Sequence, residues 1–395
     1  MSNWQELDER YFLQTAKRLP VTLVRGEGAK VWDDKGKEYL DFVGGWGVNS
    51  LGHCHPVVAQ TLAEQANTLI QASNQFYTIP QVRLAELLVQ SSCCDKVFLC
   101  NSGAEANAGA VKLARKYGKL QLGGAFEVMT ALNSFHGRTL AMVAATGQQK
   151  FQQPYVPLPS GFINVEYNHI EAIQKATSSQ TCAVMLEAIQ GEGGVNIPSE
   201  DYLRKVRAWC DQKGLLLILD EIQTGVGRTG TLFAYQQYGV EPDIMTLAKG
   251  LASGVPIGAL LAKNKAAVFE PGDHGSTFGG NPLACAVAYA TVRFIIDNNI
   301  SGNVQQVGQY LTTKLEELKS KFNFIVEVRG RGLLKAMEFN KDIADSVVMA
   351  CLERGLLVNR VKPNALRFMP PLIIGQKEVD QAKVILEEVL AGQRT

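Results

Sequence analysis

Two short apolar runs constrain the fold of this chain more than any other feature. Residues 215–219 end abruptly at Asp220, and residues 244–248 end just as abruptly at Lys249. Aliphatic runs of this length are typical of parallel strands that are buried on both faces. Open α/β sheets bind their ligands beyond the carboxyl ends of such strands, so an acid and a lysine at two strand ends indicate a site. Taken alone, the two side chains fit a buried structural ion pair better than a site.

Three further segments repeat the pattern of a strand that ends in polar or glycine-rich sequence. Strands are predicted at residues 97–100, 126–132 and 183–186, and they lead into NSGAEAN, NSFHGRT and EAIQGEGG. Strands that alternate with helices imply crossover connections and a mainly parallel sheet. The carboxyl ends of such strands meet at one edge, and we therefore expect all five strand ends to form a single site.

The length and composition predict a globular α/β protein with more than one domain. The chain has 395 residues, of which 46% are hydrophobic and 19% are charged. After residue 282 the pattern changes to long helices at 283–298 and 304–319, followed by short strands. We therefore predict an N-terminal arm and part of a small domain (1–55), a large domain (56–285) and a C-terminal small domain (286–395).

Several partners and locations are disfavoured by the sequence. The net charge of +1 does not favour nucleic acid or an anionic membrane surface as a partner. The N-terminus has no apolar signal core and no apolar segment is long enough to cross a bilayer, so a cytoplasmic protein is expected. The eight cysteines form no Cys-x-x-Cys pair and are expected to be free thiols. For His53-Cys54-His55, a turn with satisfied side chains is favoured over a metal site, and no metal is predicted.

The segment Ser102-Gly103-Ala104 lies between a predicted strand and a predicted helix. Free backbone N–H groups at a helix N-terminus favour a phosphate, and a glycine lets the backbone approach it closely. The same residues also fit an ordinary N-cap, in which Ser102 caps the helix and Glu105 occupies the third helical position. Both interpretations stay open at this point.

The segment GVGRTG at 225–230 matches the pattern G-x-G-x-x-G literally. A dinucleotide site needs the first glycine directly at a strand-to-helix turn and an acid at the end of the next strand. Here Asp220 to Gln223 intervene, and the next strand ends in a lysine. We therefore interpret the segment as a glycine-rich loop that shapes the site, and a nicotinamide oxidoreductase is only an alternative.

A phosphate cradle, an aspartate at one strand end and a lysine at another together suggest pyridoxal 5′-phosphate (PLP). A lysine amine forms a Schiff base with the PLP aldehyde, and a carboxylate keeps the pyridine nitrogen protonated so that the ring withdraws electrons. An aromatic side chain fixes the plane of the ring, and Phe135 leaves a neighbouring strand at a suitable place.

With these residues in place, the sequence resembles the class III PLP-dependent aminotransferases of fold type I. The resemblance is carried by SGAEAN, FHGRT, DEIQTGVGRTG, LAKG and HGSTFGGNPLACA. Within this family it is closest to the acetylornithine aminotransferase group, through RGEGAKVWDDKGKEYLDF, the LGHCHP turn, IQGEGG and LRFMPPL. It extends from about residue 20 to the C-terminal helix, and it implies a large domain with a mainly parallel sheet flanked by helices and a smaller α/β domain.

The resemblance implies a set of residues that bind the cofactor. Lys249 would hold PLP as a Schiff base and then move the proton between substrate and cofactor. Asp220 would pair with the pyridine nitrogen, Gln223 would lie near the ring hydroxyl, and Phe135 would stack on the ring. The phosphate would be bound by Ser102, Gly103, Ala104 and, across a homodimer interface, by Thr277 of the partner subunit.

The resemblance also implies residues that bind the substrates. Arg138 would clamp a substrate carboxylate with its guanidinium fork, and Ser276 would lie near the substrate. Glu192 would pair with Arg367 and release it when 2-oxoglutarate brings a second carboxylate. Trp46 would stand at the pocket wall, where acetylornithine-type enzymes usually carry a small aliphatic residue.

The implied activity is transfer of the ω-amino group of N-acetylornithine to 2-oxoglutarate within arginine biosynthesis, which yields N-acetylglutamate 5-semialdehyde and glutamate. Trp46, and Ala16 where many relatives have Tyr, depart from the usual pattern and leave the donor open. The alternatives are an ornithine, succinyl-diaminopimelate or 4-aminobutyrate aminotransferase, or a semialdehyde aminomutase. From other classes they are the nicotinamide oxidoreductase and a catalytically silent PLP-binding protein.

Overall fold

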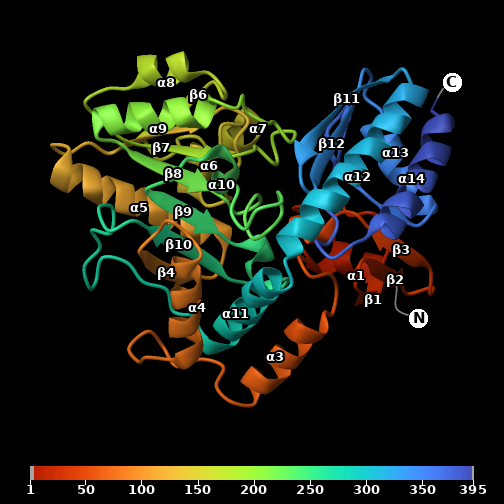
Figure 1. The fold of residues 1–395 in the computed structure, drawn as a ribbon, viewed down its shortest axis with the longest axis horizontal. Helices are drawn as coiled ribbons and strands as arrows, with labels where there is room; N and C mark the ends of the chain where they lie inside the picture. Colours follow the sequence, from red (N-terminus) through yellow and green to blue (C-terminus); the bar gives the residue numbers. More distant parts are fainter. Residues whose placement is uncertain (1–3, 394–395) are drawn as a thin grey trace.

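The computed structural model describes residues 4–393, and within this range seven strands form one central sheet (Figure 1). Their order is β4-β10-β9-β8-β7-β5-β6, in which β10 is antiparallel to both neighbours and all pairs from β9 to β6 are parallel. The mainly parallel sheet predicted from the sequence is therefore confirmed. The strands are β4 (Lys96–Cys100), β5 (Glu127–Ala131), β6 (Phe162–Val165), β7 (Thr181–Glu187), β8 (Leu216–Asp220), β9 (Ile244–Leu247) and β10 (Gly258–Ala262).

The central strands are continuously aliphatic because both of their faces are covered. In β8, Leu216 and Ile218 pack with residues of helix α5 in one cluster, whereas Leu217 and Leu219 belong to the larger cluster on the other face. Successive side chains of a strand point to opposite faces, so a strand covered on both sides must be apolar at every position. The helices around this sheet are α3 (Pro56–Ala66), α4 (Ile79–Gln90), α5 (Gly103–Gln121), α6 (Leu140–Ala145), α8 (Ile170–Ala176), α9 (Tyr202–Lys213) and α11 (Pro282–Asp297).

Two smaller sheets, on the right of Figure 1, lie beside the central one within the described residues. One joins the N-terminal strands β1 (Leu23–Glu27), β2 (Lys30–Asp33) and β3 (Glu38–Asp41) to β13 (Leu356–Leu357), which pairs in parallel with β3. The other has the order β11-β12-β15-β14. Its strands are β11 (Ile325–Arg331), β12 (Leu334–Phe339), β14 (Asn359–Lys362) and β15 (Ala365–Phe368), and the helices beside them are α12 (Ile300–Lys321), α13 (Ala344–Glu353) and α14 (Gln376–Ala391).

The pairing of β3 with β13 brings the N-terminal strands into one sheet with the C-terminal part of the chain. The division into 1–55, 56–285 and 286–395 stays a prediction, and its boundary after residue 285 falls inside α11. The short elements α1 (Trp4–Tyr11), α2 (Gly44–Gly47), α7 (Gln149–Gln152), η1 (Gln153–Tyr155), α10 (Tyr235–Tyr238) and η2 (Lys249–Ala252) complete the described chain.

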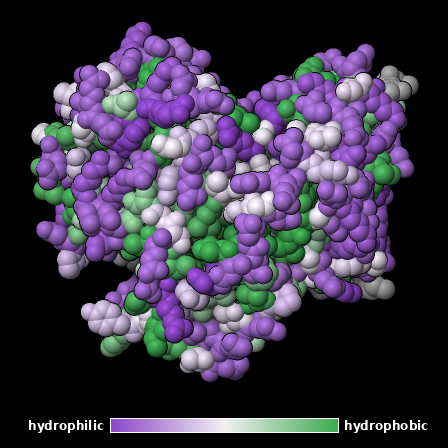
Figure 2. All heavy atoms as spheres, in the orientation of Figure 1, coloured by the Kyte–Doolittle hydropathy of each residue, from purple (hydrophilic) through white to green (hydrophobic). Residues whose placement is uncertain are grey.

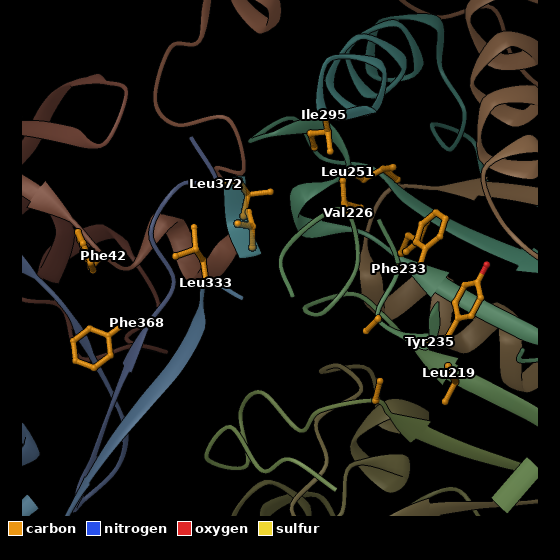
Figure 3. Close-up of a cluster of buried hydrophobic side chains, with 14 of the residues drawn as sticks. Phe42, Leu219, Val226, Phe233, Tyr235, Leu251, Ile295, Leu333, Phe368 and Leu372 are labelled. Carbon is orange, nitrogen blue, oxygen red and sulfur yellow. The ribbon is translucent and has the colours of Figure 1, made fainter. Parts of the chain in front are cut away.

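The main apolar core continues between the central sheet and the smaller sheets. Figure 3 shows Leu333 and Leu372 on one side and Val226 on the other, all members of one buried cluster. Val226 belongs to the glycine-rich loop 225–230, and its neighbour Arg228 donates hydrogen bonds to the carbonyl oxygens of Leu333 (3.1 Å) and Pro370 (2.5 Å). This loop therefore joins the two parts of the molecule.

Polar residues cover most of the face in Figure 2, and apolar residues gather mainly across its lower centre. Among residues 4–393, the helices are too short or too polar for any of them to cross a lipid bilayer.

Candidate active site

The predicted strand ends open into one cavity of about 440 Å³. This volume lies in the range of ordinary small-molecule sites. The cavity is lined by nine of the residues proposed from the sequence: Ser102, Gly103, Ala104, Phe135, Arg138, Glu192, Asp220, Gln223 and Lys249. Among the described residues that line it, none comes from 225–230. The glycine-rich loop, interpreted from the sequence as shaping the site, does not line the cavity itself, and its Val226 and Arg228 pack between the two parts of the molecule.

Asp220 ends β8 in a position where three donors surround its carboxylate. Oδ2 accepts hydrogen bonds from Asn107 Nδ2 (2.7 Å) and from His136 Nδ1 (2.8 Å), and Oδ1 accepts one from the backbone N–H of Ile222 (3.0 Å). Thr246 fixes the amide of Asn107 because its hydroxyl donates to Asn107 Oδ1 (2.7 Å). These three hydrogen bonds fix the orientation of the buried carboxylate.

His136 stands behind Asp220 and is itself fully buried. Burial alone would lower the pKa of His136, but the hydrogen bond to Asp220 and the Asp220 charge outweigh it, and the pKa is raised. Its Nε2 atom has no hydrogen-bond partner among the described residues. The pair therefore places a carboxylate and an imidazole at the base of the cavity.

Lys249 follows β9 and lies close to Asp220 because the two strands are neighbours. Asp220 is in register with Thr246, three residues before Lys249. The φ angle of Lys249 is 42°, a left-handed conformation that non-glycine residues seldom adopt and that is concentrated at functional sites. Burial lowers the pKa of the Lys249 amine, an effect that Arg367 reinforces and the negative charge of Glu192 opposes. A larger fraction of the amine is therefore neutral and available as a nucleophile or a base.

The N-terminus of α5 faces the same cavity. Ser102 caps this helix, since its hydroxyl accepts from the N–H of Glu105 (3.2 Å), and Glu105 accepts in return from the N–H of Asn101 (2.9 Å). The first N–H groups of a helix have no acceptor within it, so those of Gly103 and Ala104 stay available for an anion. The N-cap and the anion site proposed from the sequence are thus compatible.

Phe135 and Arg138 form a wall of the cavity after β5. The Arg138 guanidinium lies 4.0 Å from the ring centre of Phe151 and 5.2 Å from that of Phe135. The backbone N–H of Phe135 donates to Glu187 Oε2 (3.1 Å), and Glu187 Oε1 accepts from the N–H of Gly191 (3.1 Å). Burial raises the pKa of Glu187 to about 7.

Glu192 and Arg367 form an ion pair at the side of the cavity. Arg367 Nη1 donates to Glu192 Oε1 (2.7 Å), and the Arg367 side chain is completely buried whereas that of Glu192 is 31% exposed. Gln223 bridges the pair, since it donates to Glu192 (3.2 Å) and accepts from Arg367 (3.1 Å). Burial would raise the pKa of Glu192, but the charges of Arg367 and Lys249 and hydrogen bonds to Arg367 and Gln223 lower it to about 2.

Three residues proposed from the sequence lie away from this cavity in the single chain. Ser276 and Thr277 line a separate surface cavity, where Ser276 Oγ accepts from Asn101 Nδ2 (3.0 Å). Trp46 is 59% exposed. It lies in α2, where φ is positive at all four residues from Gly44 to Gly47, a left-handed turn that three glycines make possible.

The two histidines of the His53-Cys54-His55 turn have partners of their own. His53 Nε2 lies 2.7 Å from Asp41 Oδ2, and His55 Nδ1 accepts from the N–H of Val57 (3.3 Å) at the start of α3.

The sequence reasoning missed three residues that shape the site: Asn107, His136 and Glu187. Asn107 and His136 stand inside the quoted motifs SGAEAN and FHGRT, and Glu187 is the last residue of β7. Two of them carried a signal in the sequence: Asn107 is an amide in a helix start that otherwise has small residues, and Glu187 is a carboxylate at the end of a further strand. Their contacts to Asp220, Phe135 and Gly191 depend on packing between elements.

The residues present fit PLP. The α5 N-terminus offers N–H groups for a phosphate, Asp220 offers a carboxylate for a protonated ring nitrogen, and Lys249 offers an amine for the aldehyde. A Cβ atom on Gly103 would lie 2.7 Å from Ile222 Cδ1, so a glycine is needed to keep the backbone this close to the cavity wall.

Comparisons with known proteins identify the family. A family model described as Aminotransferase class-III matches residues 11–390. The chain is 50% identical to an acetylornithine aminotransferase from Caldanaerobacter subterraneus subsp. tengcongensis, over 98% of this chain and 99% of that protein. It is also 50% identical to an acetylornithine aminotransferase from Methanocaldococcus jannaschii, over 98% of each chain.

Among solved structures, an ornithine aminotransferase from Toxoplasma gondii superposes with a TM-score of 0.95 at 36% identity, over 99% of this chain and 94% of that one. An N-acetylornithine aminotransferase from Stenotrophomonas maltophilia superposes with a TM-score of 0.85 at 39% identity, over 98% of each chain. The chain therefore belongs to the class-III aminotransferases.

Proposed function

We propose that this protein is a PLP-dependent aminotransferase that transfers the ω-amino group of N-acetylornithine to 2-oxoglutarate, as a step of arginine biosynthesis. One observation carries the proposal. Lys249 and Asp220, at the ends of neighbouring strands, share a cavity with Glu192, and Glu192 forms an ion pair with the buried Arg367. An amine, a fixed carboxylate and a neutralised guanidinium are the groups that amino transfer between unlike substrates requires.

The cofactor, when bound, supplies an electron-withdrawing ring that stabilises negative charge on the substrate carbon bearing the amino group. The chain supplies the site that binds the cofactor. Asp220 would face the ring nitrogen, Phe135 would lie against the ring, and Gly103 and Ala104 would bind the phosphate through backbone N–H groups.

Lys249 would hold the aldehyde group covalently and act as the base and acid of the reaction. Its lowered pKa makes it able to accept a proton from the substrate carbon and to return that proton elsewhere. Asp220 would stay oriented toward the ring nitrogen, because Asn107 and His136 hold its carboxylate.

Two arginines would recognise the carboxylates of the substrates. Arg138 lines the cavity and is exposed enough to pair with the carboxylate that both substrates carry. Arg367 is neutralised by Glu192 while the amino donor is bound, and it is released when 2-oxoglutarate brings its second carboxylate. The exposed part of Glu192 gives its side chain room to leave.

The choice of donor rests on the sequence relatives. Two relatives at 50% identity are named acetylornithine aminotransferases, whereas a solved structure that superposes with a TM-score of 0.95 is an ornithine aminotransferase at 36% identity. Fold similarity alone therefore does not separate the two donors, and identity over the full length favours N-acetylornithine. Trp46 is the residue on which a preference for another ω-amino donor would depend.

We further propose a homodimer whose interface completes each site. Large aromatic side chains are exposed around Thr277: Phe76 (66%) and Tyr77 (99%) line the same surface cavity, and Phe278 (64%) follows Thr277 in the chain. Association through this surface would bring Thr277 of the partner subunit to the phosphate.

All eight cysteines lie within the described residues as free thiols, in line with the reducing cytoplasm as the proposed location.

A donor panel tests the function. Purified enzyme with PLP is assayed for glutamate formation from 2-oxoglutarate with N-acetylornithine, ornithine, succinyl-diaminopimelate and 4-aminobutyrate. The proposal expects the highest kcat/KM with N-acetylornithine. A higher value with any other donor would refute the donor, and no glutamate with any of them would refute the aminotransferase.

A further inference from the structure

One row of residues crosses the β11-β12-β15-β14 sheet and faces the loop that carries Glu192. Arg329 of β11 is in register with Ala336 of β12, and Ala336 is in register with Arg367 of β15. Residues directly opposite each other in paired strands place their side chains on the same face of the sheet. Arg329 and Arg367 therefore project from one face, with Ala336 between them.

Both arginines hold the same loop, residues 190–196, at points two residues apart. Arg367 donates to the Glu192 carboxylate (2.7 Å). Arg329 donates twice to one backbone oxygen, that of Gly194, through Nε (3.0 Å) and Nη2 (2.7 Å). The guanidinium fork of Arg329 thus anchors the loop backbone next to the ion pair that the reaction must open and close.

The loop itself is held as one unit. Gln190 and Asn196 exchange backbone hydrogen bonds of 3.1 and 3.0 Å, and Asn196 Nδ2 donates to Gln190 Oε1 (2.8 Å). Between the two arginines, Ala336 packs in a small buried cluster with Val195 of the loop. Because the backbone is fixed at both ends and at Gly194, the side chain of Glu192 is the part left to move away from Arg367.

We propose that Arg329 is a positioning residue that sets how strongly Glu192 competes with a substrate dicarboxylate for Arg367. The inference rests on the proposed function, in which Arg367 binds Glu192 with one substrate and the second carboxylate with the other. With Gly194 anchored, Glu192 returns to Arg367 whenever the dicarboxylate leaves. Without the anchor the loop moves, the ion pair weakens, and Arg367 becomes more available to dicarboxylates.

The surroundings of Arg329 determine which variants are informative. Its Nη1 atom also lies 2.6 Å from carboxylate oxygens of Glu327 and of Glu338, so a neutral replacement leaves these two acids without their cation. Arg329→Met removes the anchor and the charge together. Arg329→Lys keeps the charge between the acids but cannot place two N–H groups on one carbonyl oxygen.

Arg331→Met is the matched control. Arg331 lies on the same strand and contacts the large domain elsewhere, at Gln237 (3.3 Å) and over the ring of Tyr238 (4.9 Å). Its replacement loosens the contact between the two parts of the molecule without touching loop 190–196. Glu192→Gln is the reference, since it removes the competing charge and sets the largest effect that freeing Arg367 can have.

The experiment is a calorimetric titration of the PLP-loaded enzyme with glutarate, an unreactive dicarboxylate with as many carbons as 2-oxoglutarate. Arg329→Met and Arg329→Lys are expected to bind glutarate about fivefold more tightly than the unmodified protein, a coupling of ordinary size. Arg331→Met is expected to bind as the unmodified protein does. In the Glu192→Gln background, Arg329→Met should not tighten glutarate binding further, because no ion pair is left to weaken.

Three results would overturn the inference. If Glu192→Gln tightens glutarate binding and neither Arg329 variant does, the anchor has no part in the competition, although the switch at Arg367 stands. If Arg331→Met tightens binding equally, the effect is a general loosening of the molecule. If Glu192→Gln itself has no effect, the switch is false and the inference fails with it. Should Arg329→Met not fold, Arg329→Lys alone decides between these results.

Discussion

His136 and Asp220 share a buried hydrogen bond of 2.8 Å, and Asn107 donates a second one, of 2.7 Å, to the same carboxylate oxygen. Asp220 therefore owes its orientation to residues from α5 and from the loop after β5, and the backbone N–H of Ile222 completes its set of donors. A carboxylate that is already oriented before the ligand binds does not have to be reoriented on binding, so this free-energy cost is avoided.

Replacing Asn107 by leucine should weaken the site without unfolding the protein. A hydrogen bond to a charged group contributes about 1.5–3 kcal/mol, which corresponds to a loss of about ten- to a hundredfold in PLP affinity or in kcat. Equilibrium dialysis with PLP and steady-state assays measure the two quantities. Thr246→Val, which removes only the bond that orients Asn107, should have a smaller effect, and an unimpaired Asn107→Leu enzyme would contradict the role given to this network.

Lys249→Ala should abolish turnover because the positioned acid–base group is lost, a reduction of at least about 10²–10⁴-fold. The chain offers a matched control in Lys335 of β12, a second lysine whose pKa burial lowers, to about 8, and whose amine donates to Gly330 O (3.1 Å). Lys335→Met should keep kcat within about threefold of the unmodified enzyme if it folds, as expected of a residue outside the cavity. If Lys335→Met lowered kcat more than Lys249→Ala did, the catalytic amine would have been assigned to the wrong lysine.

Glu192→Gln should lower the KM for 2-oxoglutarate and raise that for the amino donor, each by about tenfold, since Arg367 is then no longer neutralised. The pKa of Glu192 is lowered to about 2 from its ordinary 4.5, so the group is ionised throughout pH 5.5–9 and the effect should be constant over this range. Its contribution to stability is present above pH 4.5 and is lost as the pH falls through 2. Steady-state kinetics at five pH values measure both KM values, and a difference that disappears at pH 6 would argue against an ionised Glu192.

Tyr77→Glu should convert the proposed dimer into monomers and reduce activity, because it places a charge on a side chain that is 99% exposed in the single chain and that we assign to the interface. Sedimentation velocity gives the assembly state, and an assay on the same sample gives the activity. Tyr155→Glu, at an aromatic residue that is 55% exposed elsewhere, should leave both unchanged. A Tyr77→Glu protein that stays dimeric would place the interface on another surface.

The strand ends could be predicted from the sequence because a strand buried on both faces leaves a continuous aliphatic run. The termination of β8 at Asp220 and of β9 shortly before Lys249 was visible for this reason. The antiparallel insertion of β10 was not anticipated, since the short segment GALLA is apolar in either direction. Strand direction depends on the connections and not on the composition of the strand.

The supporting residues of the site could not be predicted because their roles depend on contacts between distant segments. Asn107 lies 113 residues from Asp220, and Arg329 lies 135 residues from Gly194, whose carbonyl oxygen it holds. Trp46 illustrates a local difference, since three glycines around it form a left-handed turn that leaves the indole exposed in the single chain. Its contact with a substrate stays a prediction.

The visible absorbance of the PLP-loaded enzyme tests the central claim most directly. Addition of N-acetylornithine alone should bleach the absorbance of the bound PLP as the amino group passes to it, and addition of 2-oxoglutarate should restore it. Lys249→Ala should not complete this cycle. An absorbance that no ω-amino donor changes, or that 2-oxoglutarate fails to restore, would contradict the account.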